Sequence, residues 1–175
     1  MSEGIENLLF MQRGQEQPQE NVALFIDHEN LFLSGRKYGI SNGYDFDKLI
    51  KLSKKYGRLV LAYVFGAEGN KQYEFFRLGV EPKFTPYDSH KSLADPMMIC
   101  EILCTLYERP DINVFIIATS DKDFIPVLLH LSKNKDRKNV IVVGFAETAG
   151  TLIIDVCTNL NFNFLEYKNI CKIIT

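Results

Sequence analysis

Two short apolar runs in this chain lead directly into acidic residues. The run 22–26 is followed at once by Asp27, and the run 114–118 is followed three residues later by Asp121. Apolar runs of this length are typical of strands that are covered on both faces of a parallel sheet. The carboxyl ends of such strands meet at one edge, where ligands bind at the point at which the strand order reverses. The sequence therefore predicts an α/β fold whose ligand edge carries at least two carboxylates.

Strand and helix patterns alternate from residue 21 onward. The predicted strands are 22–26, 59–65, 82–85, 114–118, 140–143 and 162–165. The predicted helices are 47–56 with Asp47 as its N-cap, 70–78, 95–107, 124–131 and 151–157. This alternation indicates right-handed βαβ units and a mostly parallel sheet between layers of helices.

Length and composition set the domain organisation that we expect. A chain of 175 residues with 46% hydrophobic residues is long enough for one domain with a substantial core. We expect that domain over residues 21–175, preceded by a flexible arm over residues 1–20 that is rich in Gln and Glu. The sequence has no apolar stretch of about 18 residues and no signal-peptide pattern, so we expect a cytoplasmic protein without a membrane partner.

The cysteines and the net charge limit the functions that this protein can have. The four cysteines show no C-x-x-C spacing, which favours reduced thiols, and we expect Cys100 and Cys104 to be buried in an apolar helix. A formal net charge of −2 argues against a protein that coats nucleic acid through bulk electrostatics. It does not exclude a nuclease, because acidic metal ligands themselves lower the net charge.

Two further carboxylates are expected near the same edge of the sheet. Asp95 precedes a predicted helix, and Pro96 after it is tolerated in the first helical turn, so Asp95 should occupy the N-cap or a neighbouring position. Asp123 follows Asp121 by two residues. Each carboxylate alone is better explained as a helix cap or as a charge that favours the helix dipole. Together they would repel one another, and a cation or a raised pKa would have to offset that repulsion.

Carboxylates at such an edge suit hard divalent cations. Mg²⁺ typically takes one or two protein carboxylates and completes its shell with waters and phosphate oxygens. A cation held in this way lowers the pKa of a water and stabilises charge on a phosphate. Lys91, four residues before Asp95, is a candidate for contact with a substrate phosphate. For His28, next to Asp27, we expect an orienting hydrogen bond and not general-base catalysis.

The same residues carry a resemblance to a known family. In order, the chain contains Phe25-Ile26-Asp27-x-x-Asn30, Lys91-x-x-x-Asp95, Thr119-Ser120-Asp121-x-Asp123-Phe124-x-Pro126, Val143-Gly144-Phe145 and Asp155-x-Cys157. This ordered set resembles the NYN domain, the LabA-like branch of the PIN-like nuclease superfamily, over roughly residues 21–167. The resemblance implies a PIN-like, Rossmannoid three-layer fold whose sheet has the strand order 3-2-1-4-5.

The resemblance also implies a function, that of a metal-dependent endoribonuclease which hydrolyses phosphodiester bonds of single-stranded or structured RNA. The catalytic residues and ligands of Mg²⁺ or Mn²⁺ would be Asp27, Asp95, Asp121 and Asp123. The substrate-binding residues would be Asn30, Lys91 and Ser120, with Ser120 orienting a carboxylate or the attacking water. The RNA target, the choice of metal and the formation of a homodimer are left open.

Two alternative functions remain at this point. A phosphatase of the haloacid dehalogenase type also begins with an aspartate at a strand end, but it requires a second aspartate where this chain has Glu29. The other alternative is an NYN-like protein with weak catalysis that binds RNA or a protein partner. The intact acidic set favours the enzyme over this alternative.

Overall fold

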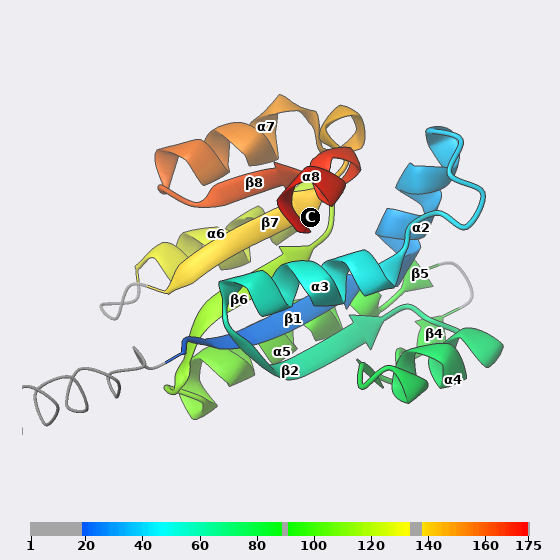
Figure 1. Cartoon of the computed structure of the whole chain (residues 1–175), viewed down its shortest axis with the longest axis horizontal. Helices are drawn as coiled ribbons and strands as arrows, with labels where there is room; N and C mark the ends of the chain where they lie inside the picture. Colours follow the sequence, from blue (N-terminus) through cyan, green and yellow to red (C-terminus); the bar gives the residue numbers. More distant parts are fainter. Residues whose placement is uncertain (1–18, 89–90, 134–137, 175) are drawn as a thin grey trace, which may run out of the picture.

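The computed structural model describes residues 19–88, 91–133 and 138–174, and its centre is a parallel sheet (Figure 1). Within the described residues the sheet has six strands in the order β3-β2-β1-β6-β7-β8. The strands are β1 (Asn21–Asp27), β2 (Arg58–Phe65), β3 (Glu81–Pro82), β6 (Ile112–Ala118), β7 (Asn139–Gly144) and β8 (Asn163–Glu166). In chain order this is 3-2-1-4-5-6, so the predicted α/β class and order are confirmed, and β8 extends the sheet beyond β7.

The two central strands are the apolar runs that the sequence identified. Residues 22–26 of β1 have no exposed surface, and residues 114–118 of β6 are almost as fully buried. Alternate side chains of β1 enter different cores, with Leu24 on one face of the sheet and Phe25 on the other. Burial on both faces explains why these strands lack the alternation of polar and apolar residues seen in half-exposed strands.

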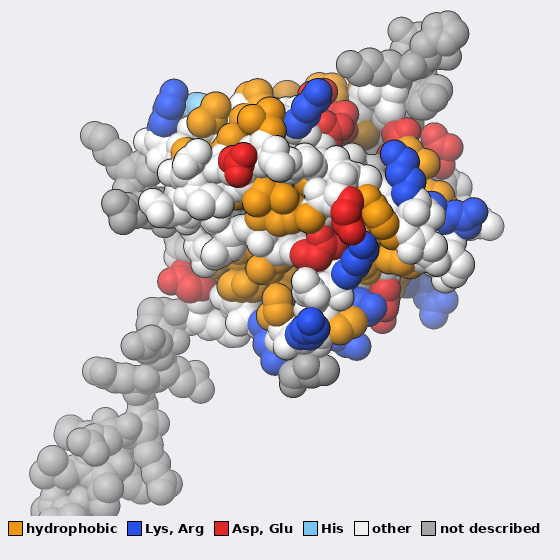
Figure 2. All heavy atoms as spheres, turned by 90° about the horizontal axis from the view of Figure 1, so that it is seen from above, with side chains coloured by type: hydrophobic (Ala, Val, Ile, Leu, Met, Phe, Trp, Pro, Cys, Tyr) orange, Lys and Arg blue, Asp and Glu red, His pale blue; other side chains and the backbone are white. Residues whose placement is uncertain are grey.

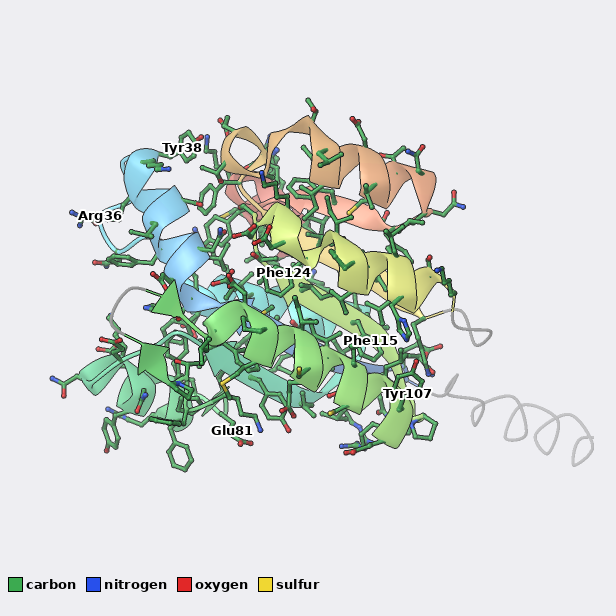
Figure 3. The ribbon with its side chains drawn as sticks, turned by 180° about the vertical axis from the view of Figure 1, so that it is seen from behind. Arg36, Tyr38, Glu81, Tyr107, Phe115 and Phe124 are labelled. Atoms are coloured by element: carbon green, nitrogen blue, oxygen red, sulfur yellow. The ribbon has the colours of Figure 1, made fainter. Side chains whose placement is uncertain are left out.

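Helices cover both faces of the sheet. The helices are α2 (His28–Lys37), α3 (Phe46–Tyr56), α4 (Asn70–Arg77), α5 (Ala94–Glu108), α6 (Ile125–Ser132), α7 (Ala146–Asn159) and α8 (Cys171–Ile174). Helices α3 and α8 lie on one face, and α5, α6 and α7 lie on the other (Figures 1 and 3). Phe115 and Phe124 are buried in the second of these layers (Figure 3). The predicted three-layer arrangement is therefore present.

Several elements differ from their predicted bounds. Helix α2 was not predicted, and the strand predicted at 82–85 is paired only over Glu81–Pro82. Helix α3 is capped by Asp45, whose side chain accepts a hydrogen bond from the backbone N–H of Asp47, the residue predicted as the cap. Helix α7 begins at Ala146, before the predicted start at Thr151. It is kinked at Gly150, so the regular part of the helix begins at Thr151.

Two further expectations concern the start of the chain and helix α5. Most of the predicted arm, residues 1–18, lies outside the described residues. Its last residue, Glu20, accepts a backbone hydrogen bond of 2.8 Å from Arg58 at the start of β2. Cys100 and Cys104 are exposed on α5, so the prediction that they are buried is wrong. They lie on the side of the helix that turns away from the sheet.

A close approach between β6 and β7 determines how the end of β6 is placed. A Cβ atom added to Gly144 would lie 2.6 Å from the carbonyl oxygen of Thr119 and 2.8 Å from Oγ of Ser120. Gly144→Ala must therefore push the two strand ends apart, and we expect it to lower the free energy of unfolding by about 1–3 kcal/mol. Urea denaturation measures this change. A stability equal to that of the wild type would show that the two strand ends are not held in contact.

Candidate active site at the carboxyl edge of the sheet

Asp27 ends β1 and also caps helix α2. Its side chain is 2% exposed. One carboxylate oxygen, Oδ1, accepts a hydrogen bond of 3.1 Å from the backbone N–H of Asn30, which satisfies a free donor in the first turn of α2. The other oxygen, Oδ2, accepts a hydrogen bond of 2.8 Å from the hydroxyl of Thr119. The carboxylate is thus held between its own helix and the neighbouring strand.

Thr119 connects Asp27 to Asp121. While its hydroxyl donates to Asp27, the same oxygen accepts a hydrogen bond of 3.1 Å from the backbone N–H of Asp121. Asp121 in turn caps the short 3-10 helix η1 (Lys122–Phe124), because its Oδ1 accepts a 2.9 Å hydrogen bond from the N–H of Asp123. Thr119 was not among the predicted site residues, although it stands beside Ser120 and Asp121 at a predicted strand end.

Asn30 and Ser120 form a second connection across the same edge. The side-chain oxygen of Asn30 accepts a 2.8 Å hydrogen bond from the backbone N–H of Ser120. The hydroxyl oxygen of Ser120 accepts a 2.8 Å hydrogen bond from the N–H of Phe145, just beyond β7. Ser120 is 3% exposed. In this structure the two side chains hold the ends of β1, β6 and β7 together, which is a positioning role within the protein.

Asp95 reaches the site from the first turn of α5. A hairpin formed by β4 (Tyr87–Asp88) and β5 (Lys91–Ser92) precedes this helix. The hydroxyl of Ser92 accepts a 3.2 Å hydrogen bond from the N–H of Ala94, the first residue of α5. Asp95 is half-buried in the next position, two residues after the N-cap Leu93, so it lies in the first turn and slightly beyond the predicted cap position. The backbone of Lys91 belongs to β5, but its side chain lies outside the described part of the structure.

Two of the predicted carboxylates, Asp95 and Asp121, act electrostatically on a third, Asp27. Burial is the main cause that raises the pKa of Asp27 from 3.8 to about 7, and the neighbouring charges of Asp95 and Asp121 raise this pKa further. The hydrogen bonds from Asn30 and Thr119 oppose these effects. Asp123 is exposed and contributes its backbone N–H to the cap at Asp121. Within residues 19–88, 91–133 and 138–174, no three His, Cys, Asp or Glu side chains are gathered closely enough to hold a metal together.

His28 points away from these carboxylates. Its Nδ1 lies 2.8 Å from the hydroxyl of Tyr44, and its ring packs against Phe32 and Phe75. Burial lowers the pKa of His28 to about 4, with the charge of Lys71 as a further cause. His28 is therefore neutral at pH 7, and its ring nitrogen contacts the hydroxyl of Tyr44. An orienting role of His28 in the acidic site stays a prediction.

The fold and this edge together define a class of protein. A parallel sheet of order 3-2-1-4-5-6, with helices on both faces and carboxylates at the ends of its first and fourth strands, is the arrangement of a PIN-like α/β domain. The sequence profile of the NYN domain matches residues 21–164, most of the chain. The chain belongs to the NYN family, which is part of the PIN-like nuclease superfamily.

A solved structure shows the same fold. The crystal structure of a protein of unknown function from Vibrio parahaemolyticus superimposes with a TM-score of 0.71, over 89% of this chain and 98% of that chain. The two sequences are 20% identical, so the likeness shows the fold alone. A search among curated proteins found no match.

The contact between Thr119 and Asp27 can be tested without a substrate. Thr119→Val keeps the shape of the side chain but removes the partner of Oδ2 of the buried Asp27 carboxylate and the partner of the Asp121 N–H, while the hydrogen bond from Asn30 to Oδ1 remains. We expect the free energy of unfolding to fall by about 1–3 kcal/mol in chemical denaturation. Thr158→Val is the matched control, because the hydroxyl of Thr158 is exposed and bonds only to its own helix. Equal effects of the two substitutions would contradict the role assigned to Thr119.

The raised pKa of Asp27 predicts a pH dependence of stability in the metal-free protein. Between pH 3.8 and about 7 the folded state retains a proton on Asp27 that the unfolded chain has lost. Stability therefore falls as the pH rises through this window, with a slope of up to about 1.4 kcal/mol per pH unit from this group. The Asp27→Asn variant has no carboxyl group at this position and lacks this pH dependence. We therefore expect the free energies of unfolding of the wild type and the variant, measured by urea denaturation in EDTA, to diverge across this pH range. Parallel curves would show that Asp27 titrates normally.

Proposed function

We propose that this protein is a metal-dependent endoribonuclease that hydrolyses RNA phosphodiester bonds at the carboxyl edge of its sheet. One observation carries the proposal. In a chain of the NYN family, the buried carboxylate of Asp27 lies within the electrostatic influence of Asp95 and Asp121. A fold does not need this crowding for its stability, since burial of like charges is unfavourable. A site that binds a cation benefits from it.

The donor set fits a hard divalent cation, Mg²⁺ or Mn²⁺. The oxygens belong to carboxylates, and Mg²⁺ requires only one or two of them because waters and phosphate oxygens complete its shell. Asp27, Asp95 and Asp121 are the residues from which these one or two carboxylates would come, while the exposed Asp123 would contribute from the rim. When bound, such an ion supplies a more acidic water and stabilises negative charge on the phosphate.

The protein's own residues would position the reaction. Thr119 fixes the orientation of the Asp27 carboxylate, and its contact with the N–H of Asp121 fixes the second acidic residue relative to the first. The side chains of Asn30 and Ser120 accept hydrogen bonds from backbone N–H groups and so hold the strand ends together. We propose that each also contacts the substrate. Lys91 stays a candidate for contact with a phosphate of the RNA.

Partner and compartment are part of the same proposal. RNA, single-stranded or structured, is the proposed partner, and the cytoplasm is the proposed compartment. No helix in the described ranges is long and apolar enough to cross a membrane. The haloacid dehalogenase alternative is not supported, because Glu29 is exposed on α2. A binding protein with weak turnover is the alternative that experiment must separate.

Cleavage of labelled RNA in Mg²⁺ or Mn²⁺, with EDTA as the metal-free reference, tests the proposal. We expect Asp27→Asn and Asp121→Asn each to reduce cleavage by orders of magnitude, because each removes charge that the cation requires. Asparagine retains the capping oxygen at both positions, so the fold should persist. Glu108→Gln is the control, since it removes an exposed charge at the opposite end of α5 from Asp95.

Two results would overturn the proposal. One is the lack of metal-dependent cleavage of any RNA by the folded wild type. The other is full activity in both aspartate variants, which would place the catalytic centre elsewhere. Activity that falls equally in Glu108→Gln would show that the effect comes from general charge and not from the site.

A further inference from the structure

Helix α4 exposes aromatic rings to solvent. Of its eight residues only Phe75 is buried, whereas Tyr73 is 67% exposed and Phe76 is 68% exposed. Phe84, two residues beyond β3, is 78% exposed. Apolar side chains that gather on the outside of a protein indicate a site of interaction with a partner. We refer to Tyr73, Phe76 and Phe84 as the α4 surface.

The α4 surface holds most of the exposed aromatic side chains in the described part of the structure. Another exposed ring, Tyr107, lies near the end of α5, and its hydroxyl contacts the ring of His130. Helix α4 packs against β3, which is an outer strand of the sheet. Figure 3 shows Glu81 of β3 and Tyr107 at separate places on the border of the molecule. The exposed rings are therefore concentrated near the β3 edge and are not spread evenly over the protein.

The two rings of α4 lie on the side of the helix that is opposite to a cavity. Lys71, Glu74 and Phe75 line this cavity, which has a volume of about 600 Å³ and reaches the start of α2. At about 100° per residue, these three positions share one side of α4, and Tyr73 and Phe76 lie on the opposite side. The rings of α4 therefore face away from the carboxyl edge of the sheet, where the proposed catalytic residues lie.

The charged groups of α4 favour a protein partner over RNA. Lys71 forms a 3.0 Å ion pair with Glu74. The guanidinium group of Arg77 lies 6.0 Å from the ring centre of Tyr73, at the limit for a cation–π contact. RNA binding needs several cations that are free to contact phosphates. The core of a protein interface is instead enriched in Tyr, Phe and Arg, which is the composition of this side of α4.

The exposed face of α4 is complementary to itself. Tyr73 and Phe76 are three residues apart and share this face. When two copies pack α4 against α4 in antiparallel directions, about a twofold axis between these rings, each Tyr73 meets Phe76 of the other copy. In the same pairing Arg77 lies opposite Gln72, so the two arginines are kept apart. Parallel pairing would place them side by side and is therefore disfavoured.

The exposed area is sufficient for a small interface. An aromatic side chain has a surface of about 150–250 Å², so the three rings together expose about 400 Å² in each copy. Two copies would bury about 800 Å² through these rings alone, and the side chains around them would bring the total close to the about 1,000 Å² that a specific interface requires. An area of this size suits a dimer that forms reversibly and not a permanent one.

We propose that this protein forms a reversible homodimer in which the α4 surfaces of two copies pack against each other in antiparallel directions. The proposal does not depend on the proposed nuclease activity, because it concerns a different face of the molecule. It identifies the partner of the α4 surface as a second copy of the same chain.

Sedimentation velocity over a series of protein concentrations tests the proposal. We expect the average mass of the wild type to rise from one chain toward two as the concentration increases. Tyr73→Ala and Phe76→Ala should each raise the dissociation constant of the dimer by about tenfold or more, because each removes two contacts that are related by symmetry. Tyr107→Ala is the matched control, since it removes a ring of similar exposure, 65%, from α5. Urea denaturation checks that each variant is folded.

A pair of complementary charges tests the antiparallel arrangement. The Tyr73→Lys and Phe76→Glu variants each lose both ring contacts when they associate with themselves. In an equal mixture, one native ring contact is kept, and the introduced ammonium group meets the introduced carboxylate at the other. We therefore expect the mixture to dimerise more strongly than either variant alone. A mixture of Tyr107→Lys with Phe76→Glu is the control and should show no such gain.

Several results would overturn the proposal. A wild type that stays a single chain at every concentration shows that a second copy does not cover the α4 surface. If Tyr73→Ala then weakens the binding of a labelled RNA single strand, the surface binds RNA instead. A dimer that is unaffected by both alanine substitutions uses another face, and a mixture without gain contradicts the antiparallel pairing. Failure of RNA cleavage in a protein that dimerises as expected would overturn the nuclease alone.

Discussion

The hydrogen bond from the hydroxyl of Thr119 to the buried carboxylate of Asp27 determines how the whole edge is built. A carboxylate that is 2% exposed is costly unless hydrogen bonds replace the water that it has lost. The N–H of Asn30 comes from the helix that Asp27 itself caps, whereas Thr119 comes from the neighbouring strand. That donor is available only because β1 and β6 are adjacent and parallel, with Ile26 opposite Ala118. The buried position of Asp27 thus depends on the strand order that places β6 next to β1.

A second set of hydrogen bonds, made within the protein, fixes the backbone position of Asp121. Asn30 accepts from the N–H of Ser120, and Ser120 accepts from the N–H of Phe145, so the ends of three strands are joined without any charged group. Gly144 permits this arrangement, because any side chain there would meet the backbone of Thr119. Asp121 therefore leaves β6 in a fixed direction while its own side chain stays half-buried. Neutral groups provide the rigidity, and the carboxylates remain available for chemistry.

The sequence predicted the sheet and the strand ends that carry aspartate, because long buried strands have a distinctive composition. The strand order followed from the resemblance to the NYN domain. It did not predict α2, in which Gly35 lies where a Cβ would come within 1.6 Å of the carbonyl oxygen of Gly43. A contact between segments of this kind has no local pattern. Nor does spacing give the direction of a side chain. Asp121 and Asp123 are two residues apart, yet one is half-buried beside Asp27 and the other is exposed. Metal binding by the full set of four stays a prediction.

The charge distribution of the surface bears on how RNA could be held at this site. Figure 2 shows acidic and basic side chains next to one another with hydrophobic side chains between them, and the chain has a net charge of −2. A face of mixed charge has no single-sign field to attract RNA, and release of counterions requires several phosphate contacts by Lys or Arg. In the proposed function, a cation at Asp27, Asp95 and Asp121 would instead supply the positive charge that a phosphate group requires at this edge of the sheet.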